Sequence, residues 1–222
     1  MRSYLIEECA QYLADKDRQP EGLVDNAGMT GPELAEVLIH LTGNSNKRVK
    51  NRAAKLLSHL SQVNAAAVEN HREPIIAMFR ERDNILRWNA LTVLGNISGY
   101  LSIDECRGLL RVLDELLDGD SMVTAGHVIF ALEKMALNHP GLQSEIIARM
   151  LAVESWPFKP ECIGILTGKV LSALESLAPS LSMESDGFPA VREFAKRHLN
   201  SGKSSISHSA RRIMKMCQRK SD

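Results

Sequence analysis

Apolar residues recur along this chain with the spacing of one face of an α-helix. Between Val49 and Leu60 they fall at positions i, i+4, i+7, i+8 and i+11, a period of 3.6 residues. The spacing returns at successive shifts of 37, 38, 42 and 40 residues, in stripes that begin at Leu86, Thr124, Leu166 and Ile206. Because a period near 40 residues is typical of helical repeat proteins, the pattern predicts a repeated unit.

A second apolar helical segment precedes each of these five segments, which predicts five helix pairs. The preceding segments begin their apolar patterns at Leu34, Ile75, Leu109, Ile146 and Val191. We predict one domain over residues 1–222, with an N-terminal capping helix at 1–14, a polar linker at 15–30 and the pairs at 31–220. A helix pair cannot bury both apolar faces alone, so we expect the pairs to stack side by side.

Local signals mark where these helices begin and end. Thr30–Glu33 and Ser102–Glu105 have the spacing of capping boxes. The residues expected to cap second helices of the pairs are Asn46, Asp83 and Ser121. Glycines expected to end helices in the left-handed conformation are Gly43, Gly99 and Gly119.

The segment from Asp83 to Ile97 resembles the second helix of a HEAT repeat. The family pattern is Asp, Val-Arg, a spaced Ala, Leu-Gly and an aliphatic residue, matched here by Asp83, Leu86-Arg87, Ala90, Leu94-Gly95 and Ile97. Over about residues 30–220 the other pairs keep mainly the apolar spacing. The resemblance implies an all-α, right-handed α-solenoid of about five stacked antiparallel pairs, HEAT-like or armadillo-like. It also implies a binding scaffold, the usual role of such families.

The composition fits a globular helical protein, with 44% hydrophobic and 5% aromatic residues. Few aromatics disfavour a β-sandwich or barrel, because strands favour them. No stretch approaches the roughly 20 apolar residues that cross a membrane, so we expect a cytoplasmic protein without a membrane partner. The cysteines lie far apart, which favours small buried thiols over disulfides or a zinc site: Cys9, Cys106, Cys162 and Cys217.

No sequence motif of a known catalytic or cofactor site is present. The chain contains no Walker A, GxGxxG, GxSxG or HExxH pattern. The His-Glu dipeptides with which some HEAT-like hydroxylases bind iron are missing too. HEAT-like alkylpurine DNA glycosylases resemble this chain in size but need a basic concave face, whereas residues 61–190 carry seventeen acidic and ten basic residues. We therefore predict a protein that is not an enzyme and binds no cofactor or metal.

The side of each second helix opposite its apolar stripe is the first candidate binding surface. In α-solenoids these helices usually line the concave face, and positions i+2, i+6 and i+9 point away from the core. Two aromatic and two acidic residues occupy such positions: Trp88, Phe130, Glu133 and Glu175. We predict a shallow apolar groove with an acidic border that binds a protein or peptide. The alternative is that both aromatics pack between helices as core.

Trp156-Pro-Phe158-Lys-Pro160 forms a second candidate contact. Two prolines and two aromatics in five residues predict a rigid turn, and Pro160 is suited to start the next helix. Trp156 and Phe158 either contact the partner or cover the edge of the core.

The C-terminal end of the chain is strongly basic. Residues 191–222 hold nine Lys or Arg against two acids. Arg212, Lys215 and Arg219 share one helix face, flanked by Arg211. Such a ridge attracts phosphate or carboxylate groups. Nucleic-acid binding, including a glycosylase-like function, is therefore the alternative to the scaffold. It is disfavoured because no aromatic residue follows Phe194 to stack on bases.

Overall fold

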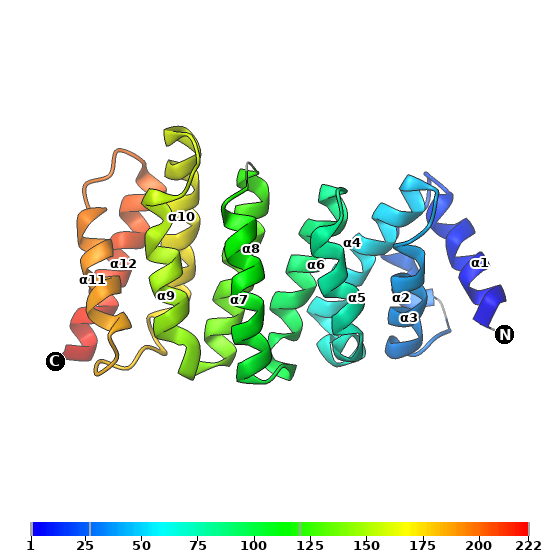
Figure 1. Ribbon diagram of the computed structural model, residues 1–222, viewed down its shortest axis with the longest axis horizontal. Coiled ribbons are helices and arrows are strands. Elements are labelled where there is room, and N and C mark those ends of the chain that lie inside the picture. The colour runs from blue at the N-terminus through cyan, green and yellow to red at the C-terminus, as the bar shows by residue number, and fades with distance from the viewer. Residues whose placement is uncertain (1, 27, 120, 222) are drawn as a thin grey trace. The chain divides into compact units, whose positions relative to one another are not determined.

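The computed structural model describes residues 2–26, 28–119 and 121–221, and in these residues it contains helices and no β-strand. Met1, in the predicted capping helix, Ala27, in the predicted linker, and Asp222, at the predicted domain end, lie outside the described residues. The chain divides into two compact units, Met1–Tyr100 and Leu101–Asp222. Each unit is built from helix pairs, so the predicted all-α class of fold is confirmed (Figure 1).

The first unit holds the N-terminal helix and two helix pairs. Helices α3 and α4 form one pair, α5 and α6 the next, and α4 packs against α6. The N-terminal helix α1 contacts both α3 and α4, while α2 lies within the segment predicted as a linker. The helices are α1 (Arg2–Ala14), α2 (Gly22–Asn26), α3 (Gly31–Leu41), α4 (Lys47–Val63), α5 (Arg72–Ala77) and α6 (Asn84–Ile97).

The second unit holds three helix pairs, α7 with α8, α9 with α10 and α11 with α12. The second helices of these pairs form a row, in which α10 lies between α8 and α12 and contacts both. Among the first helices, α9 contacts α11. The bounds are α7 (Ile103–Leu117), α8 (Met122–Asn138), α9 (Gln143–Leu151), α10 (Pro160–Leu177), α11 (Gly187–Arg197) and α12 (Ser204–Ser221).

The predicted apolar stripes of the second helices form the core of both units. Every stripe position is buried except Met214, which is half-buried. Thr124, the polar member of the stripes, is only 2% exposed. Among the thiols, Cys9, Cys106 and Cys217 are buried and Cys162 is half-buried. None of the helices in the described residues is long and apolar enough to cross a bilayer.

The helix starts follow the sequence, whereas the predicted left-handed helix ends are wrong. At α7 the Ser102 N–H donates to Glu105 Oε2 at 2.7 Å, and the Glu105 N–H donates to Ser102 Oγ at 3.3 Å. Second helices are capped as predicted by the side chains of Asn46, Asp83 and Ser121. Of the glycines predicted to be left-handed, Gly99 lies in a 3-10 turn, and neither Gly43 nor Gly119 has a positive φ. These helices end by tightening into another right-handed turn, as where the Gly43 N–H donates to the His40 carbonyl.

Candidate functional site

The residues predicted to form one groove are divided between the two units. Trp88 lies on α6 in the first unit and is half-buried. Phe130 and Glu133 lie on α8, and Glu175 on α10, all half-buried in the second unit. A single surface made by these four residues stays a prediction. Half-burial of both rings lies between the two alternatives, full exposure and full burial in the core.

Within the second unit, Phe130 and Glu175 each contact a basic side chain. The Lys134 ammonium lies 5.5 Å from the centroid of the Phe130 ring, in the range of a cation–π contact. Arg212 Nε lies 2.8 Å from Glu175 Oε1. This ion pair joins a residue of the predicted acidic border to one of the predicted basic ridge, so the acidic border is partly neutralised.

A side chain of the next repeat lies over each of three glycines in this row of second helices. A Cβ at Gly126 on α8 would lie 3.1 Å from Lys169 Cε on α10. At Gly164 on α10 it would lie 2.5 Å from Lys203 Nζ, just before α12. At Gly168 it would lie 3.6 Å from Ile206 Cγ1. The missing side chains of these glycines thus allow the next repeat to approach closely. At Gly126 and Gly164 the approaching side chain is a lysine.

Two adjoining hollows lie where α10 meets the start of α12, and we call them together the α10–α12 groove. The first has a volume of about 390 Å³ and is lined by Gly164, Ile165, Gly168 and Lys169 from α10 and by Lys203 and Ile206. The second, also of about 390 Å³, includes His208 and Arg212 in its lining. Ser205 and Ser209 line both hollows, so they join into one surface. The sequence analysis missed this groove. Its signal is the Gly164-x-x-x-Gly168 spacing inside a helix, followed directly by Lys169.

The segment with Trp156 and Phe158 forms a tight turn before α10. The Phe158 N–H donates to the Trp156 carbonyl at 2.8 Å, and Pro160 is the first residue of α10. Both aromatic side chains are half-buried. They therefore cover part of the protein while leaving ring surface accessible, and their contact with a partner stays a prediction.

The predicted basic ridge lies on α12, which contains no acidic residue. Arg211, Arg212, Lys215 and Arg219 are all exposed. The neighbouring Lys220 has a structural role, because its ammonium donates to the Pro179 and Leu181 carbonyls at 2.8 and 2.6 Å. Arg212 is the member of the ridge that also lines the α10–α12 groove.

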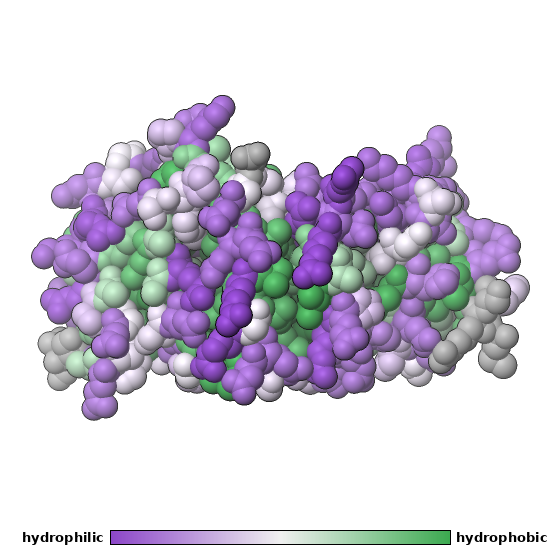
Figure 2. Space-filling model, viewed as in Figure 1, coloured by the Kyte–Doolittle hydropathy of each residue, from purple (hydrophilic) through white to green (hydrophobic). Residues whose placement is uncertain are grey.

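The first helices of the second unit carry ion pairs between neighbours. Arg149 on α9 pairs with Asp114 on α7 at 3.1 Å and with Glu145 at 3.2 Å. Arg197 on α11 pairs with Glu154 at 2.8 Å. In the view of Figure 2, hydrophilic residues cover much of the surface and hydrophobic residues are visible between them. Asp114, Glu145 and Glu154 are therefore held by arginines of the first helices.

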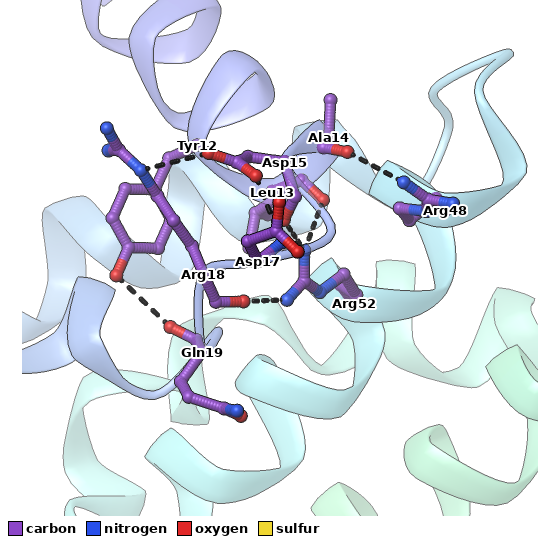
Figure 3. A network of polar contacts seen from close by, with 9 residues as sticks. All are labelled: Tyr12, Leu13, Ala14, Asp15, Asp17, Arg18, Gln19, Arg48 and Arg52. Atoms are coloured by element: carbon purple, nitrogen blue, oxygen red, sulfur yellow. Dashed lines mark hydrogen bonds and ion pairs between the residues drawn. The ribbon is translucent and has the colours of Figure 1, made fainter.

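Arginines of α4 bind the C-terminal end of α1, a role that the sequence analysis missed (Figure 3). The Arg52 guanidinium donates to the backbone carbonyls of Leu13, Asp15 and Arg18, the first at 3.0 Å. Arg48 Nη1 donates to the Ala14 carbonyl at 3.1 Å. The Leu13 and Ala14 carbonyls are among those that a helix end leaves without intrahelical donors. The Asp15 and Arg18 carbonyls lie in the segment that follows α1. The contacts fix the N-terminal helix and the following loop on the first repeat.

Comparison with known proteins identifies the fold. No family model and no curated protein matches this chain. An engineered protein of known structure matches with a TM-score of 0.62 and 16% identity, over 96% of each chain. A designed armadillo repeat protein in complex with the peptide (KR)4 matches with a TM-score of 0.63 and 13% identity, over 96% of this chain and 91% of that one. Computationally designed armadillo repeat proteins for modular peptide recognition match with a TM-score of 0.59 and 13% identity, over 95% and 91%. The chain therefore has an armadillo-like helical-repeat fold, as its HEAT-like resemblance implied.

Proposed function

We propose that this chain is a helical-repeat scaffold that binds a protein or peptide partner on the face of its second helices and catalyses no reaction. The observation that carries the proposal is the α10–α12 groove, an open site between two second helices of an armadillo-like fold. Ile165 on its rim is 46% exposed, an apolar contact available to a partner. Similar designed armadillo proteins recognise peptides, which supports the same class of ligand.

The half-buried aromatics extend the proposed surface beyond the groove. Phe130 under Lys134 lies on α8, the second helix next to α10. Trp88 would supply the corresponding contact in the first unit, and Trp156 and Phe158 a contact beside the start of α10. Aromatic side chains provide much of the energy at protein interfaces. We propose that the scaffold acts in the cytoplasm.

A peptide selection with matched isoleucine variants tests this proposal. Purified protein is used to select binding peptides from a random library, and their affinities are measured by fluorescence anisotropy. We expect Ile165→Glu to weaken binding about tenfold or more, because it places a charge in the apolar contact. Ile103→Glu is the control, since Ile103 is 39% exposed on the first helix α7. Equal loss in both variants, or failure to select any peptide, would contradict the proposal.

The acid-free α12 favours nucleic acid as the second candidate partner. Arg211, Lys215 and Arg219 project from it into solvent. Phosphate contacts make affinity fall steeply with salt, so retention on immobilised DNA at low salt is the discriminating measurement. Absence of retention removes this candidate and leaves the peptide scaffold.

A further inference from the structure

We propose that the α10–α12 groove binds an extended acidic peptide segment that carries one aliphatic side chain. This inference rests on the proposed function and names the chemistry of its ligand. The charge, hydrogen-bonding groups and shape of the groove each support it.

The charge of the groove is positive and available. Lys169 and Lys203 line it from the two sides, and both side chains are exposed. Neither ammonium group has an ion-pair partner among the described residues, in contrast to Arg149 and Arg197 on the first helices. The field of Lys169 also reaches His127, whose pKa is lowered by burial and further by this lysine. Carboxylates of a peptide would complete the unfilled ion pairs.

The few acids near the groove leave this charge in place. On α10, Glu175 is held by Arg212 at 2.8 Å. Glu161 is exposed in the first turn of α10, and α12 on the other side has no acidic residue. Arg211 and Lys215 add positive charge elsewhere on α12. The potential across the groove therefore attracts a negatively charged chain.

Hydroxyl groups between the lysines supply directional donors. Ser209 lines both hollows, is only 9% exposed, and makes no hydrogen bond through its side chain with any described residue. Ser205 also lines both hollows and Ser172 lines the first. The Ser209 hydroxyl is not among the fully buried side-chain groups without a partner, so solvent reaches it in the free protein. A carboxylate or peptide carbonyl of the ligand would accept its hydrogen bond.

The shape of the groove fits an extended chain with one apolar side chain. Gly164 and Gly168 carry no side chains, so the α10 helix is narrow where Lys203 and Ile206 approach it, and Ile165 and Ile206 supply apolar lining. From Gly164 to Ser172 the helix rises about 12 Å at 1.5 Å per residue. An extended peptide covers that distance with about four residues at 3.3 Å each.

Peptide is favoured over nucleic acid because no Phe, Tyr or Trp side chain lines either hollow. Single-stranded nucleic acids are held by stacking of bases on such rings as well as by positive charge. An exposed isoleucine offers an aliphatic peptide side chain a better contact than it offers a phosphate backbone. Nucleic acid is therefore treated as a competing outcome of the test.

The test uses a fluorescein-labelled peptide of about eight residues, alternating Glu and Asp around a central Leu. Two control probes are the same peptide with Lys at every acidic position and a single-stranded oligodeoxynucleotide of equal charge. We expect the full-length protein to bind the acidic peptide and not the Lys peptide. Charge reversal by Lys169→Glu with Lys203→Glu should weaken acidic-peptide binding by about tenfold or more, because two attractions become repulsions.

A matched charge reversal elsewhere separates the groove from net charge. Arg111→Glu with Lys196→Glu makes the same change on the exposed surfaces of α7 and α11. We expect this control to weaken binding less than about twofold at physiological salt, where distant charges are screened. Circular dichroism establishes that both variants remain folded.

Three results would overturn the inference. They are equal effects of the two double variants, binding of the Lys peptide as tight as that of the acidic peptide, and tighter binding of the oligodeoxynucleotide than of the acidic peptide. If selected peptides of another chemistry still depend on Ile165, the proposed function stands and only the acidic ligand is wrong. If no peptide of any chemistry binds, both fail together.

Discussion

Replacing the glycines of the second unit by alanine tests the described packing between repeats. Within a helix, alanine is more favourable than glycine by about 0.8–1.0 kcal/mol. A Cβ at Gly108 on α7 would meet no neighbouring group within 4 Å, so Gly108→Ala should show this effect alone. We expect it to stabilise the protein by about 1 kcal/mol.

The groove glycines should depart from that reference in ways that the distances predict. At Gly168 the added methyl would meet Ile206 Cγ1 at 3.6 Å, an ordinary contact, so Gly168→Ala should stabilise at least as much as Gly108→Ala. At Gly164 it would lie 2.5 Å from Lys203 Nζ, so that side chain must move. Because a lysine end is flexible, Gly164→Ala should lose only part of the gain and remain within about 0.5 kcal/mol of the parent protein.

Urea unfolding followed by tryptophan fluorescence measures these changes. A Trp88→Phe background leaves Trp156 as the single reporter, which lies in the second unit together with all three glycines. A gain of about 1 kcal/mol should also raise Tm by about 2–4 °C for a protein of this size. Destabilisation by Gly168→Ala would refute the described approach of α10 and α12. Destabilisation by more than about 1 kcal/mol at Gly164 would show that Lys203 is fixed rather than mobile.

Three further predictions concern the core, the N-terminal helix and pH. Leu132→Ala should destabilise by about 2–5 kcal/mol in urea unfolding, and Met214→Ala by less, since Leu132 is fully buried and Met214 is half-buried. Arg52→Ala should lower the free energy of unfolding by about 2 kcal/mol. It should also accelerate amide hydrogen exchange in α1, because Arg52 binds the Leu13 carbonyl near the end of that helix. Burial lowers the pKa of His127 and His198 below the ordinary 6.5. Below pH 6.5 the unfolded chain therefore binds more protons than the folded protein. The free energy of unfolding should be highest above pH 6.5 and fall as the pH is lowered toward the folded-state pKa values. This fall should be less steep in a His127→Gln, His198→Gln variant.

The helix pairs follow from sequence because their signals are local. Burial of one helix face imposes the 3.6-residue spacing, and a hydroxyl or amide such as Asn46 caps the helix that begins beside it. The glycine prediction failed for a related reason. Gly43 is able to adopt a positive φ but is not obliged to, and a further right-handed turn satisfies the same carbonyls.

The candidate site was less predictable because it depends on the register between neighbouring helices. When the apolar stripes of α10 and α12 are aligned, each residue of α10 corresponds to the residue of α12 that is 40 positions later in the sequence. The observed neighbours lie at smaller shifts, 38 for Gly168 with Ile206 and 37 for Glu175 with Arg212. Because of this offset, Lys203 and Ile206, at the start of α12, lie beside Gly164 and Gly168 of α10. Side-chain packing between helices sets the offset, and no spacing within one helix reveals it.

Of the two glycines of the groove, Gly168 is difficult to explain by packing alone. A Cβ at Gly168 would make an ordinary contact, so alanine would fit and would make α10 more stable by about 1 kcal/mol. Gly164 holds open the place where Lys203 crosses the helix. Net stabilities are only about 5–15 kcal/mol, so a gain of this size is a substantial fraction of the total. A groove that remains open at the expense of stability, beside lysines without acidic partners among the described residues, is the arrangement expected where a ligand backbone approaches the helix.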